Sequence, residues 1–146
     1  MPTRSARTAW NGTLEQGSGQ VELSSSKVGT YDVSFPKRAA DEAGGTTSPE
    51  ELIAAAHSSC YAMQLSAFIA EAGGTPQSLD VTADVTLGPD SANGGFAISS
   101  IALTVRGEVE GLDAAGFEAA AQKAKEGCPV SKALTGTTIT LDAGLE

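Results

Sequence analysis

Cys60 and Cys128 are the side chains of this sequence best suited to redox or nucleophilic chemistry. They are the only cysteines among 146 residues, too few for a disulfide scaffold. With the single histidine, His57, they still leave an ordinary zinc site one protein ligand short, so we rank metal binding below redox use. The alternative is that both thiols are small apolar core residues, because free cysteine packs well in protein interiors.

The local setting of the two thiols leaves open which one attacks. Cys128 directly precedes Pro129, a residue well suited to begin a short helix, and the first amides of that helix favour a thiolate. Cys60 lies well inside a longer predicted helix, beyond the reach of the helix dipole, so its ionisation needs a cation. Local reasoning therefore favours Cys128 as the more acidic thiol.

Three basic residues and the histidine are candidates for activating Cys60. Lys37 and Arg38 precede the long helix, at the end of a predicted strand, and Arg106 lies on a later strand. Arg38 is favoured because a guanidinium stays charged when partly buried and bonds both a thiolate and a carboxylate, although a solvated arginine fits the spacing equally well. His57 precedes Cys60 by three positions and shares its helical face, so it is either a general base or a packed core residue.

The central predicted element is a helix of about 23 residues that begins at Pro49 and ends before Gly73 and Gly74. Ser48 suits the N-cap, and the Glu51 carboxylate is placed to return to the Ser48 amide in a capping box. We expect no membrane span, because no apolar run approaches roughly 20 residues, and no secretion signal at the N-terminus.

Strands and a second helix surround this element and predict an α+β fold. The fold is a single domain over residues 1–146, with a mainly antiparallel sheet on which the helices pack. A change of apolar parity between Ile98 and Ile101 predicts a β-bulge at Ser99 and Ser100. The other predicted elements are two or three strands before residue 36, strands over 79–87 and 137–141, a helix over 114–126 and a short helix from Pro129 to near Leu134.

Charge excludes two classes of partner. Nine basic and eighteen acidic residues give a formal net charge of -9, which repels phosphate backbones and anionic membrane surfaces. We therefore expect no nucleic acid and no membrane as partners. The cytoplasm is the default compartment, because we expect neither a membrane span nor a secretion signal.

Three ordered motifs carry a resemblance to a known family. They are SPEELI from Ser48 to Ile53, AHSSC from Ala56 to Cys60, and KAKEGCPVS from Lys123 to Ser131. Together they resemble the OsmC/Ohr family of osmotically inducible and organic-hydroperoxide-resistance proteins, and the His57-containing helix resembles the OsmC branch most. The similarity covers nearly the whole chain.

The resemblance implies a thiol peroxidase that reduces organic hydroperoxides without metal, haem or other cofactor. Cys60 matches the attacking cysteine, Cys128 the resolving cysteine, and Arg38 and Glu50 the catalytic arginine and glutamate, with Lys37 as the alternative to Arg38. A Cys60 sulfenic acid would condense with Cys128 to a disulfide, and an external dithiol would reset the pair. The resemblance also implies an intertwined homodimer with its active sites at the subunit interface.

Helix geometry adds a condition to this interpretation. Glu50 and Cys60 are ten residues apart on one helix, hence about 15 Å along its axis. They do not meet within one subunit, so a shared site requires Glu50 from a partner chain in a two-fold dimer.

Two other functions remain open from the sequence. The first is a non-catalytic binding protein that keeps the fold and uses an apolar interfacial pocket, with the cysteines as core residues. In the peroxidase interpretation, Met63 and Phe68 are instead candidate apolar residues near the thiol that would favour an alkyl hydroperoxide. The second is a thiol-disulfide oxidoreductase, which is weakened because the chain has no Cys-x-x-Cys pair.

Overall fold

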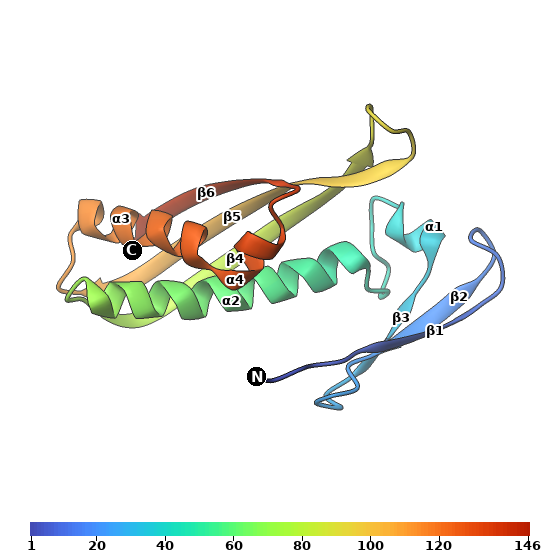
Figure 1. Ribbon diagram of the computed structural model, residues 1–146, viewed down its shortest axis with the longest axis horizontal. Helices are drawn as coiled ribbons and strands as arrows, with labels where there is room; N and C mark the ends of the chain where they lie inside the picture. The colour runs from blue at the N-terminus through green and yellow to red at the C-terminus, as the bar shows by residue number, and fades with distance from the viewer. The chain divides into compact units, whose positions relative to one another are not determined.

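The computed structural model describes residues 1–146, which pack into two compact units, Met1–Leu52 and Ile53–Glu146. The single domain expected from the sequence stays a prediction, and the two units are described separately. In chain order the elements are β1 (Arg7–Asn11), β2 (Ser18–Glu22), β3 (Thr30–Val33), α1 (Phe35–Arg38), α2 (Pro49–Glu71), β4 (Thr75–Pro89), β5 (Phe96–Glu110), α3 (Ala114–Gly127), α4 (Pro129–Ala133) and β6 (Thr138–Leu145), as labelled in Figure 1.

The first unit is a three-stranded antiparallel sheet, β1-β2-β3, followed by the short helix α1. Gly12, with a φ of +98°, lets the chain turn after β1. Lys37 and Arg38 lie in α1, so their assignment to a strand end was wrong. The Ser34 side chain caps this helix by accepting a hydrogen bond from the Lys37 amide, and Pro36 suits its first turn.

Helix α2 has the bounds and the length of 23 residues that the sequence predicted. The Ser48 hydroxyl accepts a hydrogen bond from the Glu51 amide at 3.1 Å, which is one half of the expected capping box. The other half differs, because the Glu51 carboxylate accepts a hydrogen bond from the Thr47 hydroxyl at 2.6 Å. A hydroxyl rotates freely toward its acceptor, and here it takes the place of the Ser48 amide.

The apolar character of α2 exceeds the sequence-based expectation. The helix is long and apolar enough to cross a membrane by length and composition alone, so the statement that no segment approaches this length was wrong. Alanines between the polar residues raise its mean hydropathy. Core helices pass the same test, and Tyr61, Leu65 and Ile69 of α2 are fully buried in this fold. Length and composition are thus weak evidence for a membrane span.

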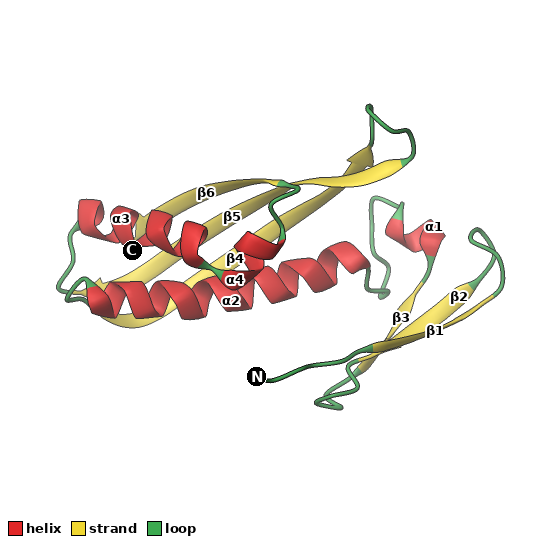
Figure 2. Cartoon of the chain, in the orientation of Figure 1, coloured by secondary structure: helices red, strands yellow, loops and turns green.

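The second unit is a three-stranded sheet, β4-β5-β6, with helices on one face (Figure 2). β4 and β5 form an antiparallel hairpin, whereas β6 pairs with β5 in parallel because α3 and α4 carry the chain back along the sheet. Thr86 pairs with Ser100 and Leu87 with Ile98, which leaves Ser99 as an extra residue. The predicted bulge is confirmed.

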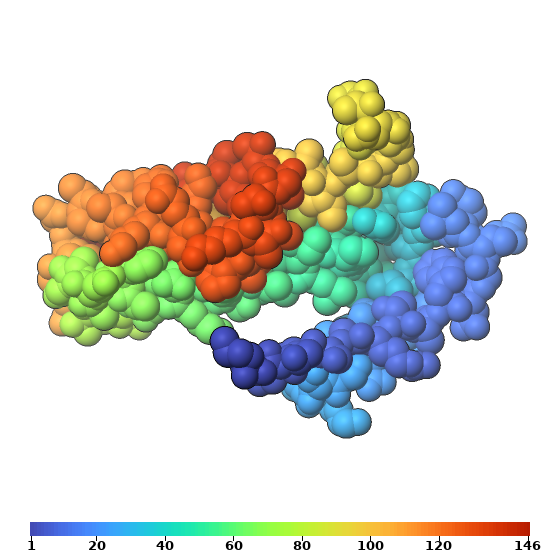
Figure 3. All heavy atoms as spheres, in the orientation of Figure 1, coloured from blue at the N-terminus to red at the C-terminus, as the bar shows by residue number.

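The core of the second unit lies between this sheet and helices α2 and α3. The space-filling view shows the atoms of α3 and α4 packed directly against α2 (Figure 3). Phe117 of α3 and Tyr61 of α2 are the largest fully buried side chains, and the Tyr61 hydroxyl donates to the Ala121 carbonyl at 3.0 Å. This packing fixes α2 against the middle of α3.

Two helix ends place Cys128. The Asp113 side chain caps α3 by accepting a hydrogen bond from the Gly116 amide at 2.8 Å. Cys128 is both the C-cap of α3 and the N-cap of α4, which begins at Pro129. The thiol therefore lies at the junction of two helices and not in either one.

Replacing Phe117 by alanine should destabilise the protein by about 3–5 kcal/mol, because the substitution leaves a cavity between α3 and the sheet. Chemical denaturation of both proteins at one concentration measures the difference. Phe96→Ala is the matched control, since that side chain is 62% exposed. Equal losses in the two variants would contradict this account of the core.

Candidate active site

Cys60 and Cys128 meet in the second unit, from elements 68 positions apart in sequence. Their sulfur atoms are 3.2 Å apart, both thiols are free, Cys128 is fully buried and Cys60 is partly exposed. A disulfide bond is about 2 Å long, so the sulfurs need to approach by only about 1 Å to form one. The structure thus brings the two predicted redox residues into reacting distance, with Cys60 the more accessible.

The surroundings of the two sulfurs make Cys128 the more acidic thiol within one chain. Burial raises the pKa of Cys60, and the neighbouring Cys128 raises it further, against the effect of the Val130 amide. Burial also opposes ionisation of Cys128, but the Ser131 amide, the Cys60 thiol and the Ser131 hydroxyl lower its pKa overall. The same order followed from local sequence reasoning. A Cys60 thiolate therefore needs a cation that its own helix does not supply.

The contacts of His57 do not suit it to act as a base for Cys60. It is fully buried, and its Nε2 lies 2.7 Å from the Ser131 Oγ of α4. Burial lowers the pKa of His57, so the ring is neutral at pH 7. Sequence reasoning did not single out Ser131. The available signal was its position three residues after Cys128, within the turn that carries the thiol.

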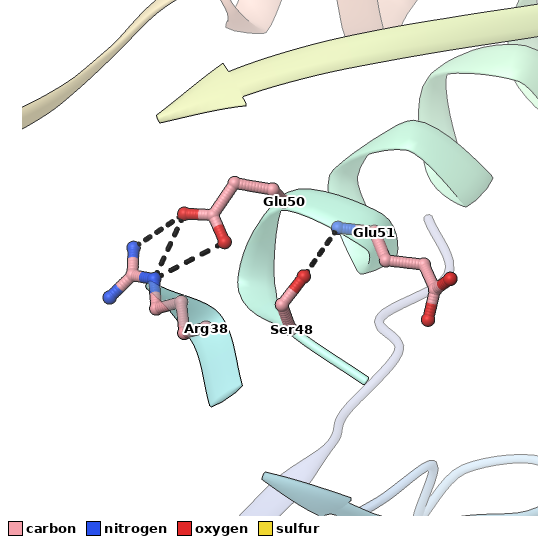
Figure 4. Close-up of polar contacts among 4 residues, drawn as sticks. All are labelled: Arg38, Ser48, Glu50 and Glu51. Carbon is pink, nitrogen blue, oxygen red and sulfur yellow. Dashed lines mark hydrogen bonds and ion pairs between the residues drawn. The ribbon is translucent and has the colours of Figure 1, made fainter. Parts of the chain in front are cut away.

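Arg38 and Glu50 form a bidentate ion pair in the first unit (Figure 4). The Arg38 Nε donates to Oε1 and Oε2 of Glu50 at 2.9 and 3.2 Å, and Nη2 donates to Oε1 at 2.7 Å. Glu50 is 8% exposed, and Figure 4 shows its carboxylate and that of Glu51 pointing to opposite sides of the helix. Burial opposes ionisation of Glu50, yet the hydrogen bonds from Arg38 lower its pKa overall.

An apolar hollow lies beside Arg38 in the first unit. It encloses about 330 Å³. Its lining is mostly apolar and includes Trp10, Val21, Phe35 and Leu52. The guanidinium is the one charged group among the lining residues, so the hollow combines an apolar wall with a single cation.

The predicted site residues thus form two pairs, one in each unit: Arg38 with Glu50, and Cys60 with Cys128. The other candidate cation, Arg106, pairs with Asp142 at 3.2 Å on the exposed surface. No group of three or more histidine, cysteine, aspartate or glutamate side chains that could hold a metal ion is present.

Two redox-capable thiols on an α+β fold of this topology define a class of thiol-redox proteins. Comparison with known proteins gives the family. The chain belongs to the OsmC-like protein family, whose profile matches residues 41–142. It is 46% identical over 137 residues to the protein named peroxiredoxin OsmC of Escherichia coli K12, which covers 94% of this chain and 92% of the relative.

Two further relatives extend the comparison to the Ohr branch. Organic hydroperoxide resistance protein OhrA of Bacillus subtilis is 35% identical over 127 residues, with 85% of this chain and 84% of OhrA covered. The crystal structure of OhrB of Bacillus subtilis superposes with a TM-score of 0.75 at 26% identity, over 95% of this chain and 97% of OhrB. The family and the α+β fold expected from the motifs are confirmed.

Glu50→Gln should destabilise the protein by about 1 kcal/mol at neutral pH, because it removes the charge that holds Arg38. The pKa of Glu50 is lower in the folded protein, so its ionised form stabilises the fold fully above the ordinary value of 4.5. This contribution is lost as the pH falls through the folded value. The difference in unfolding free energy between wild type and variant should accordingly shrink below pH 4.5.

Denaturant titrations at several pH values measure that difference. Glu51→Gln is the matched control for removing a charge from the same helical turn. A difference for Glu50→Gln that does not change with pH would contradict the ion pair as its cause.

Proposed function

We propose that this protein is a cysteine-based peroxidase that reduces organic hydroperoxides to alcohols, with Cys60 as the attacking and Cys128 as the resolving thiol. The observation that carries the proposal is the distance of 3.2 Å between a partly exposed and a fully buried thiol. Its relatives support it, since they are named peroxiredoxin and organic hydroperoxide resistance protein.

The reaction takes three steps that this thiol pair can perform. The Cys60 thiolate attacks the terminal peroxide oxygen, the O–O bond breaks, and the alkoxide takes up a proton to leave as an alcohol, so Cys60 becomes a sulfenic acid. The Cys128 thiolate then attacks the Cys60 sulfur, and the S–O bond breaks as a disulfide forms and hydroxide leaves to become water. An external dithiol returns two electrons and two protons and is itself oxidised to a disulfide.

Ionisation of Cys60 depends on Arg38 of a partner subunit. Ten residues of helix separate Glu50 from Cys60, about 15 Å along the axis, and Arg38 is bound to Glu50 of its own chain. The ion pair therefore acts as one unit on the Cys60 of another chain. There the guanidinium stabilises the Cys60 thiolate and reverses the order of acidity that one chain has alone, while Glu50 orients the guanidinium.

The apolar surface of α2 supports such a homodimer. Met63 lies one helical turn after Cys60 and is 73% exposed in the single chain, and few residues of the most apolar stretch of this helix are buried. A second copy that covers this surface removes it from water. In the same arrangement the interface carries both active sites, each with thiols from one chain and the ion pair from the other.

The substrate is an apolar hydroperoxide. The hollow beside Arg38 has an apolar wall that suits an alkyl group better than the small, polar hydrogen peroxide. We also propose that the protein is soluble and cytoplasmic, with α2 as its core helix, because redox-active free thiols persist in a reducing compartment.

Cys60→Ser should abolish the consumption of cumene or tert-butyl hydroperoxide in the presence of a dithiol, because it removes the attacking sulfur. Peroxide assay and mass spectrometry measure turnover and the intramolecular Cys60–Cys128 disulfide. The matched control is Cys128→Ser, in which, without the dithiol, one equivalent of peroxide is still consumed and a Cys60 sulfenic acid accumulates. Unchanged turnover in Cys60→Ser would instead favour a non-catalytic binding protein.

Mixing two inactive variants, Cys60→Ser and Arg38→Ala, should restore activity if each site draws on both chains. A mixed dimer then holds one complete site, so random exchange of subunits gives about a quarter of wild-type activity. Turnover is measured after subunit exchange, with each variant alone as the control. Absence of restored activity in a verified mixed dimer would contradict the shared site.

A further inference from the structure

A buried histidine and serine adjoin the resolving cysteine and have no part in the steps above. His57 of α2 is fully buried, and Ser131 of α4 is 4% exposed. Their Nε2 and Oγ atoms are 2.7 Å apart across 74 positions of sequence. Burying polar groups costs free energy unless they are paired, and this contact pairs Nε2 of His57 but leaves its Nδ1 without a partner.

The tautomer of His57 follows from its second ring nitrogen. Nδ1 is buried and has no hydrogen-bond partner. An N–H at that position would be a buried donor without an acceptor, which proteins avoid more strongly than a bare lone pair. The ring proton therefore resides on Nε2, and His57 donates to the Ser131 Oγ.

This direction leaves the Ser131 hydroxyl proton available to the Cys128 sulfur. The hydroxyl has one proton, and with its oxygen accepting from His57 that proton cannot go to the ring. Cys128 is the N-cap of α4, so Ser131 lies three residues after it in the first turn of that helix, where N-terminal amides favour a thiolate. The Ser131 amide and hydroxyl accordingly lower the pKa of Cys128. The neutral ring is thus a fixed donor and not a proton acceptor.

We propose that His57 and Ser131 are positioning residues for Cys128, which hold its sulfur as the thiolate that resolves the Cys60 sulfenic acid. The assignment rests on the peroxidase function proposed above. Cys128 attacks as a thiolate, the S–S bond forms, the S–O bond of Cys60 breaks, and the departing hydroxide takes a proton from solvent. In the reducing step the same contact makes Cys128 the better leaving group, so the external thiolate attacks the Cys60 sulfur.

Other ionisable groups near the Cys128 sulfur do not replace this pair. Cys60 is the reaction partner, 3.2 Å away. Tyr61 remains a neutral phenol, because burial raises its pKa and its hydroxyl donates to the Ala121 carbonyl. Ser131 is therefore the hydroxyl donor, and His57 fixes its orientation.

The proposal is tested by separating the two oxidation steps in Ser131→Ala, His57→Leu and His57→Gln. Rapid quenching after addition of cumene hydroperoxide, followed by mass spectrometry, counts the Cys60 sulfenic acid, the disulfide and the over-oxidised sulfinic acid. We expect sulfenic acid formation within about twofold of wild type, disulfide formation about tenfold slower in Ser131→Ala and His57→Leu, and more sulfinic acid. His57→Gln keeps an N–H donor and should recover much of the rate.

The control is Ser58→Ala, next to His57, whose hydroxyl bonds only to the Ala55 carbonyl of its own helix. Disulfide formation at the wild-type rate in Ser131→Ala would overturn the proposal. Equal slowing of both steps would also overturn it, because that result describes a structural defect and not an effect on Cys128.

A second measurement distinguishes this proposal from the peroxidase function. Ultraviolet thiolate absorbance measures the ionisation of Cys128 in a Cys60→Ser background. At pH values below the titration midpoint, Ser131→Ala should lower the thiolate fraction of Cys128 about tenfold. An unchanged titration would overturn the role of Ser131. Absence of any Cys60 sulfenic acid in wild type would instead refute the peroxidase function, and the titration alone would then decide the role of the pair.

Discussion

A thiol in the middle of a helix receives no help from that helix in losing its proton, and this constraint organises the site. Cys60 occupies such a position on α2, so its charge and its oxidation chemistry depend on groups from elsewhere. The packing of α2 against the α3–α4 junction brings Cys128 within 3.2 Å. Everything that fixes this packing, from the Phe117 core to the Asp113 cap, therefore contributes to the redox pair.

The two thiols suit different tasks because their surroundings differ. Cys60 is partly exposed and open to a substrate, whereas Cys128 is fully buried and interacts with α4. Within one chain Cys128 is the more acidic, which suits a resolving thiolate and a leaving group. In the proposed homodimer, the Arg38 guanidinium of a partner chain would supply Cys60 with the charge stabilisation that it lacks. The proposed division of roles between the two thiols follows from electrostatics and access.

The Arg38–Glu50 ion pair fixes the position of a guanidinium in the first unit. Its three hydrogen bonds hold the guanidinium in a single orientation beside an apolar hollow. A carboxylate that pairs bidentately limits the positions that an arginine can adopt and keeps it ready for a second anionic partner. In the proposed function, such preorganisation would lower the cost of binding a thiolate and an apolar peroxide together.

Local patterns in the sequence determined most of the elements. The Ser48 and Asp113 caps, the start of α4 at Pro129 and the parity change at Ser99 act over a few residues, so each could be recognised without the rest of the fold. Even so, a neighbouring hydroxyl displaced half of the capping box. The motifs around both cysteines were also enough to indicate the family.

Only the tertiary structure decided the contacts between elements distant in sequence. The turn of α1 that brings Arg38 to Glu50, the parallel pairing of β6, and the contact between His57 and Ser131 depend on packing and not on spacing. A helical position specifies which face a side chain occupies, but not what lies opposite that face. The sequence therefore identified the two thiols, and the fold determined which polar groups surround each of them.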